Sequence, residues 1–79
     1  MPPTKMTIAP NNISYTYEAI INLINEGYTT IMLNCVFENV WSNSYANILY
    51  RQLKLISDYL LVHNLYNKIY IRMLDESSF

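Results

Sequence analysis

The sequence has very little cysteine, glycine and charge. One cysteine, Cys35, excludes a disulfide within the chain and a metal site of the usual cysteine spacing. One glycine, Gly27, excludes a glycine-rich loop of the kind that holds phosphates between a strand and a helix. No uncharged apolar run approaches the roughly 20 residues of a membrane helix, and the start, MPPTKMTIAP, lacks the apolar core of a signal peptide. We therefore expect an intracellular protein, in the cytoplasm or nucleus, with no membrane contact.

The small amount of charge is slightly negative. Charged residues form 14% of the chain, against roughly 25% in ordinary soluble domains. Five basic residues are scattered along the sequence and are outnumbered by six acidic ones. Phosphate contacts supply much of the affinity of nucleic-acid-binding proteins, so tight binding to DNA or RNA by the chain alone is not expected.

Apolar residues are abundant instead. Hydrophobic residues form 52% of the 79 residues, and aromatic residues form 14%. A domain of this size buries only roughly 60% of the surface that its unfolded chain exposes. We therefore expect part of the apolar surface to lie in an interface with another chain.

Hydrophobic periodicity predicts a single α/β domain over residues 1–79, with an ordered core at 4–74 and a polar tail at 75–79. Strands are expected at 4–9, 29–35 and 68–74. Helices are expected at 14–26 and from Ser42 or Ser44 to about His63. The order is β-α-β-α-β, and we expect a three-stranded mixed sheet packed by two helices. Its first two strands would form a right-handed, parallel βαβ unit.

Local signals support these boundaries. Ser14 is the expected N-cap of the first helix, and Gly27 is the expected left-handed residue at its end. In the second strand, Ile31, Leu33 and Cys35 are expected to point to one side of the sheet.

The second helix has two apolar stripes, of which one can cover the sheet. That first stripe consists of Tyr45, Leu49, Leu53, Ile56 and Leu60. The second stripe needs another neighbour, which is either a partner subunit or the first helix. We predict a homo- or heterodimer through this helix and the third strand, with an interface of Ile48, Leu55, Tyr59, Val62 and Tyr70.

No set of catalytic groups can be assembled from the sequence. Asp58 and His63 are five residues apart on one helix, a spacing that does not bring side chains face to face. Cys35 is more typical of a small core residue than of a nucleophile. We expect no catalytic residue, no metal, no cofactor and no small-molecule substrate.

Three segments together resemble the Alba-type nucleic-acid-binding fold. AIINLINEGYTTIML resembles that family's first helix, closing glycine and second strand. IMLNCVFENVWSNSYANILY falls on the family signature, with Cys35 in the place of a small residue and Val40 in that of an isoleucine. KIYIRML resembles the third strand of the Alba-like subunits of eukaryotic ribonuclease P and its mitochondrial-RNA-processing relative. The resemblance implies an Alba-like topology and pairing with a second Alba-like chain.

The sequence departs from the family pattern in three places. Phe37 stands where the family has a glycine, and Asn39 where it has a small residue. The loop at 9–12, APNN, lacks the lysines of family members that bind nucleic acid. A fourth strand would begin where this sequence ends. These departures argue against direct coating of DNA and suggest that another chain covers the sheet edge.

Two hypotheses about function remain open. In the first, the protein is a non-enzymatic subunit of a ribonucleoprotein, as in ribonuclease P, and holds RNA jointly with its partner. Aromatic and asparagine side chains can stack on and hydrogen-bond unpaired bases, although packing is the simpler account of those at 34–43. The candidate RNA contacts are Asn11, Asn12, Asn34, Phe37, Asn39, Trp41, Asn43, Lys68 and Arg72. In the second, it is a protein-only interaction module, such as a small viral or phage factor that binds a host protein.

Overall fold

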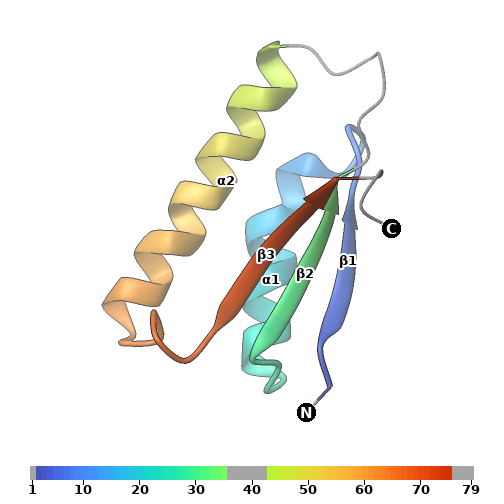
Figure 1. The fold of residues 1–79 in the computed structure, drawn as a ribbon. Helices are drawn as coiled ribbons and strands as arrows, with labels where there is room; N and C mark the ends of the chain where they lie inside the picture. Colours follow the sequence, from blue (N-terminus) through green and yellow to red (C-terminus); the bar gives the residue numbers. More distant parts are fainter. Residues whose placement is uncertain (1, 36–42, 76–79) are drawn as a thin grey trace.

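The computed structural model describes residues 2–35 and 43–75, and Figure 1 shows them as a layer of helices beside a sheet. The elements in chain order are β1 (Thr4–Ile8), the short 3-10 helix η1 (Ile13–Tyr15), α1 (Thr16–Asn25), β2 (Thr30–Cys35), α2 (Asn43–Val62) and β3 (Tyr70–Asp75). The expected β-α-β-α-β order is confirmed, with a 3-10 turn added before the first helix.

All three strands are parallel, so the prediction of a mixed sheet was wrong. The strands lie in the order β1-β2-β3, and both neighbouring pairs are parallel. Each connection contains a helix that carries the chain back to the end of the sheet at which the previous strand began, and the next strand therefore runs in the same direction. The register places Met6 beside Leu33, and Leu33 beside Met73.

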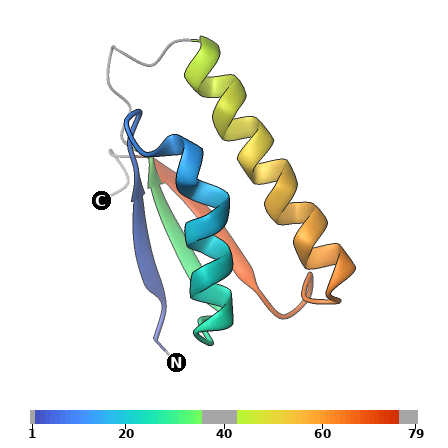
Figure 2. The same cartoon turned by 180° about the vertical axis from the view of Figure 1, so that it is seen from behind.

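Both helices cover the same face of the sheet, as the two opposite views in Figures 1 and 2 show. Two right-handed crossovers that step in one direction across a sheet place their helices on one side of it. On the covered face, the expected inward side chains Ile31, Leu33 and Cys35 are all buried. The opposite face carries the exposed side chains of Tyr70 and Arg72, although parallel sheets are usually covered on both faces.

The core lies between the sheet and the helices. Its buried apolar members are Ile8, Ile13, Ile20, Ile31, Leu33, Cys35, Ile56 and Leu60. Thr16 is buried among them, and its hydroxyl donates to the carbonyl oxygen of Ile13 at 2.9 Å. A buried hydroxyl with a hydrogen-bond partner avoids most of the cost of leaving water.

The first helix does not begin as expected. Ser14 lies within η1, and α1 begins at Thr16 without a side-chain cap from the preceding residues. Its N-terminus is instead capped by another helix, because the backbone N–H of Tyr17 donates to Oε1 of Gln52 on α2 at 2.9 Å. This bond satisfies a backbone group that no residue of α1 can reach, and it also holds α2 against α1.

Both helices end on a residue with positive φ. Gly27, at φ 102°, follows α1 as predicted, and Asn64, at φ 58°, plays the same part after α2. At each end two backbone N–H groups turn back to carbonyls of the last turn; after α2, Leu65 N–H donates to Leu60 O at 2.8 Å. This is the Schellman arrangement, which glycine and asparagine favour. Neither helix is long and apolar enough to cross a lipid bilayer, within the residues that the structure describes.

Candidate functional site

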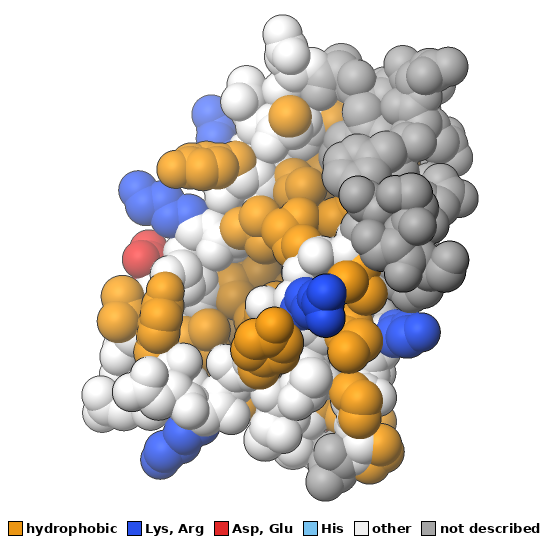
Figure 3. All heavy atoms as spheres, in the orientation of Figure 1, with side chains coloured by type: hydrophobic (Ala, Val, Ile, Leu, Met, Phe, Trp, Pro, Cys, Tyr) orange, Lys and Arg blue, Asp and Glu red, His pale blue; other side chains and the backbone are white. Residues whose placement is uncertain are grey.

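An apolar groove lies between α2 and β3. Its volume is about 360 Å³, and its walls are Leu53, Ile56, Ser57, Leu60, Tyr66, Ile69, Tyr70, Ile71 and Met73. The polar side-chain atoms of this lining are the Ser57 hydroxyl and the two tyrosine hydroxyls. Figure 3 shows apolar side chains gathered on this face between the helix and the sheet. We call this feature the α2–β3 groove.

The groove lies where α2 stands to the side of β3, while α1 lies against the strands (Figures 1 and 2). The hydrogen bond from Tyr17 to Gln52 ties the two helices together, and Ile48 packs against the core. The covered face of β2 is shielded from solvent, since Leu33 on that strand is 0% exposed. Met73, the register neighbour of Leu33 on β3, is 43% exposed. The helix layer therefore covers β2 completely and β3 only in part.

The backbone of β3 also faces this groove. The described sheet ends at β3, and the N–H of Tyr70 donates to the carbonyl oxygen of Thr29 beside β2 at 2.7 Å. Alternate residues of a strand direct their backbone N–H and C=O groups to opposite edges of the strand. Because those of Tyr70 point towards β2, those of Ile71 and Met73 point away from it. The same two residues direct their side chains into the groove.

The five predicted interface residues are spread over several parts of the second half of the chain. Tyr70 lines the groove, and Ile48 packs against the core on the helix side. Leu55 borders a separate hollow on the outer face of α2, together with Arg51, Lys54 and Asp58. Tyr59 is half-buried, and Val62 is exposed at the end of the helix.

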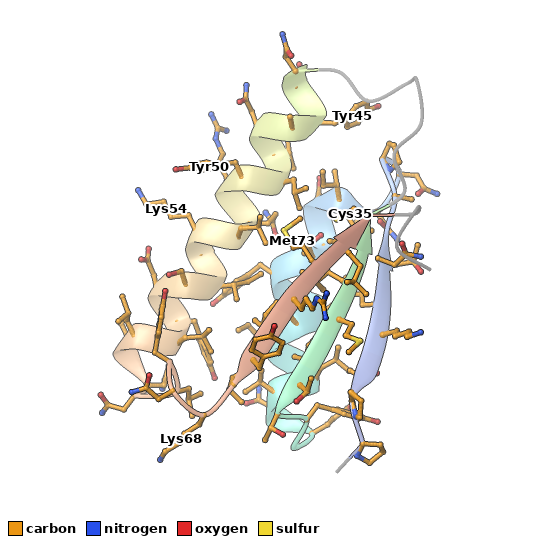
Figure 4. The ribbon with its side chains drawn as sticks, in the orientation of Figure 1. Cys35, Tyr45, Tyr50, Lys54, Lys68 and Met73 are labelled. Atoms are coloured by element: carbon orange, nitrogen blue, oxygen red, sulfur yellow. The ribbon has the colours of Figure 1, made fainter. Side chains whose placement is uncertain are left out.

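The predicted RNA contacts do not form one cluster. Figure 4 shows Lys68 at one end of the sheet and Cys35, which follows Asn34, at the other. Arg72 and Asn34 share the uncovered face of the sheet, because Arg72 on β3 is in register with Met32 on β2, two residues before Asn34. Asn11 and Asn43 are exposed, while Phe37, Asn39 and Trp41 lie outside the described residues.

Two of these asparagines have distinct local environments. Asn12 closes the turn after β1: its Oδ1 accepts from Ala9 N–H at 2.7 Å, and its Nδ2 donates to Thr7 O at 3.3 Å. Its side chain is therefore occupied in shaping the loop. In contrast, Oδ1 of Asn34 is buried and has no hydrogen-bond partner among the described residues.

The groups that carry chemistry are far apart. Cys35 is buried in the core, as predicted. The His63 ring lies against the ring of Tyr59, with centroids 4.2 Å apart. In the described part of the chain, no three histidine, cysteine, aspartate or glutamate side chains come together as metal ligands would.

Sequence reasoning missed Leu53, Tyr66 and Met73 as parts of an accessible surface. The pattern had assigned Leu53 to the stripe that covers the sheet and had placed Met73 within the third strand at 68–74. A signal was nonetheless present, because two helices seldom cover three strands completely. No family model, curated protein or solved structure matches this chain, so the function must be argued from this surface.

Proposed function

We propose that this protein is a non-enzymatic subunit that pairs with another protein chain through the α2–β3 groove. The supporting observation is the distribution of large exposed apolar side chains among the described residues. One of them, Tyr15, precedes α2, and the others lie on α2, β3 or the turn between them: Tyr50, Leu55, Leu61, Val62, Tyr66, Tyr70 and Met73. Tyr66, Tyr70 and Met73 line the α2–β3 groove together, and a contiguous group of exposed apolar residues marks a contact surface, whereas single ones are ordinary.

The groove suits a protein better than a small molecule. Ligand pockets combine apolar walls with several converging polar groups that fix the ligand's orientation. Here the lining is apolar apart from three hydroxyls. Protein interfaces place apolar and aromatic side chains at their centre, and the walls of the groove are of this kind, since they include Leu53, Ile71 and Met73.

The test is sedimentation of the complex isolated from the protein's own cells, followed by reconstitution from purified chains. We expect a complex heavier than the 9.3 kDa chain, and we expect Met73→Asp to return the chain to a monomer. Asn47→Asp, at an exposed site on the opposite end of α2, is the matched control and should leave the complex intact. A native protein that sediments as a compact monomer at high concentration would remove the proposal.

A second candidate function, RNA binding within such a complex, is favoured by the uncovered face of the sheet. Tyr70, 57% exposed, and the exposed Arg72 are on that face. An aromatic ring and a guanidinium on an open sheet can stack on unpaired bases without a large net charge. A ribonucleoprotein is also what the sequence resemblance implies.

Filter retention of single-stranded RNA at low and moderate salt tests this second function, with the chain alone and with its partner. Tyr70→Ala is expected to weaken retention about fivefold or more, because base stacking on one aromatic ring contributes about 1–3 kcal/mol. Tyr50→Ala is the control, since Tyr50 is 71% exposed but lies on α2. Absence of retention by both the chain and the complex would leave pairing as the only function.

A further inference from the structure

The outer edge of β3 carries both backbone polar groups without a strand partner among the described residues and apolar side chains that line the α2–β3 groove. The backbone N–H and C=O groups of Ile71 and Met73 point outwards, and their side chains line the α2–β3 groove. No described strand pairs with this edge. An open strand edge is a template for pairing with another chain, because every backbone polar group needs a partner.

We infer that an extended segment of the partner chain joins the sheet beside β3 as a fourth strand. Its side chains on one face would be apolar and would enter the α2–β3 groove. Those on the other face would include acidic residues, which would lie beside Arg72 on the uncovered face of the sheet. This inference rests on the proposed pairing function and names the chemistry of the partner.

A strand fits this surface better than a helix does. A helix satisfies its own backbone, so a helix in the groove would leave the outward groups of Ile71 and Met73 without partners. An added strand would bond to them, and its alternating side chains would reach the groove at every second residue. The groove follows the length of β3, since Ile69, Ile71 and Met73 all line it.

Charge favours an acidic partner over a second copy of this chain. β3 ends on Asp75, and the charged residues of the segment at 68–74, which includes the turn before the strand, are Lys68 and Arg72, both exposed and both basic. Two copies paired antiparallel in the register centred on Arg72 would set Arg72 opposite Arg72, and like charges directly opposite on neighbouring strands are destabilising. A carboxylate on the added strand would instead pair with the Arg72 guanidinium.

The test uses a fluorescent palindromic heptapeptide, Glu-Val-Glu-Ile-Glu-Val-Glu with blocked ends, and the full-length protein. The peptide is long enough to pair along all six residues of β3, and its palindromic sequence permits either strand direction. We expect saturable binding by fluorescence anisotropy. Two N-methylated peptides are then compared with the parent, one methylated at the valine and isoleucine amides and the other at the glutamate amides. Only the amides that face β3 can donate to its backbone. We therefore expect one of the two methylated peptides to lose binding.

Charge reversal supplies the second arm. Arg72→Glu should weaken binding of the acidic peptide about five- to tenfold, which is the effect of replacing an attractive cross-strand pair by a repulsive one. It should also create binding of the lysine counterpart, Lys-Val-Lys-Ile-Lys-Val-Lys. Lys54→Glu makes the same change in net charge on the outer face of α2, where Figure 4 shows Lys54 projecting away from the sheet, and it should alter binding less than twofold.

Failure of this inference can be told apart from failure of the pairing function. If Met73→Asp dissociates the native complex but neither N-methylated peptide differs from the parent, pairing stands and the added strand is overturned. If Met73→Asp leaves the native complex intact, the proposed pairing surface is overturned. Circular dichroism and the melting temperature of the variant show that it is folded. Two other outcomes would also overturn the added acidic strand. In the first, the protein retains oligouridylate on the filter but binds neither the acidic nor the lysine peptide. In the second, the protein associates with itself and Arg72→Glu strengthens that association.

Discussion

Residues 4–35 and residues 43–75 contribute comparable elements to the fold but bury them to different degrees. In the first region, the apolar residues that are at most 2% exposed are Ile8, Ile13, Ile20, Ile31, Leu33 and Cys35. In the second region the most buried residues are Ile56 at 3% and Leu60 at 7%, both on α2. None of the described side chains on β3 is fully buried.

The difference shows that apolar content alone does not decide burial. The third strand is as apolar in its alternation as the second, with Ile71 and Met73 in register with Ile31 and Leu33. What differs is the helix layer, because α1 lies against the strands whereas α2 stands to the side of β3 (Figures 1 and 2). The second region therefore keeps apolar surface that the first region has already covered.

The largest expected effect comes from truncating the two register neighbours Leu33 and Met73. Leu33→Ala should lower the free energy of unfolding by about 2–5 kcal/mol, since it empties a fully buried site. Met73→Ala should cost less than about 1 kcal/mol in the isolated chain, because much of its side chain already contacts water. Urea denaturation followed by circular dichroism measures both. A domain of this size has a total stability of roughly 4–12 kcal/mol, so Leu33→Ala could unfold it.

The ratio of the two costs is the informative quantity. Equal costs for Leu33→Ala and Met73→Ala would mean that β3 is covered as fully as β2, and the groove would not exist in solution. Leu33→Met is the conservative control, because a volume-conserving apolar change at a core site usually costs less than about 1.5 kcal/mol.

A smaller effect is expected from Gln52→Ala. The change removes the acceptor of the Tyr17 N–H, and a partly buried donor without a partner costs about 1–3 kcal/mol. Asn47→Ala, at an exposed site one and a half turns earlier on the same helix, should change stability by less than about 0.5 kcal/mol. Amide hydrogen exchange provides the sharper readout, since the Tyr17 amide should lose protection selectively. Unchanged protection there would show that another group, rather than Gln52, holds α2 against α1.

The sequence was sufficient to predict the elements, because their signals are local. The alternation of Ile31, Leu33 and Cys35 predicted the buried face of β2, and Gly27 predicted the end of α1. The error in strand direction came from the expectation of a mixed sheet, although two helical connections between three neighbouring strands permit only parallel pairs.

The candidate site was harder to predict because it depends on how far α2 stands from β3. Part of the placement of α2 is a contact between Gln52 and Tyr17, 35 residues apart, which no periodicity contains. Ile48, predicted in the partner interface, is partly buried against the core. The sequence indicated an excess of apolar surface, and the predicted interface residues remain a prediction.

The two helix ends allow a finer comparison between the regions. Gly27→Ala places a Cβ at φ 102° and should cost about 1–2 kcal/mol. Asn64→Gly, at the matching position after α2, should change stability by only a few tenths of a kcal/mol, because asparagine already tolerates the left-handed region. Thermal and urea denaturation measure both variants. A cost of Gly27→Ala below that of Asn64→Gly would contradict the backbone conformations described for the two turns.

The smallest effect is expected at Val62, which is 77% exposed at the end of α2. Val62→Thr keeps the shape and β-branching of the side chain, so the isolated chain should change in stability by less than about 0.5 kcal/mol.

The native complex provides the more informative readout, since Val62 was predicted in the partner interface but does not line the α2–β3 groove. Unchanged affinity would confine the interface to the β3 side of α2. A loss of tenfold or more with unchanged stability would extend it around the end of the helix, because a threonine hydroxyl is desolvated there without a partner. A stability loss above about 1 kcal/mol in the isolated chain would instead mean that Val62 is packed within the domain, against its exposure in the structure.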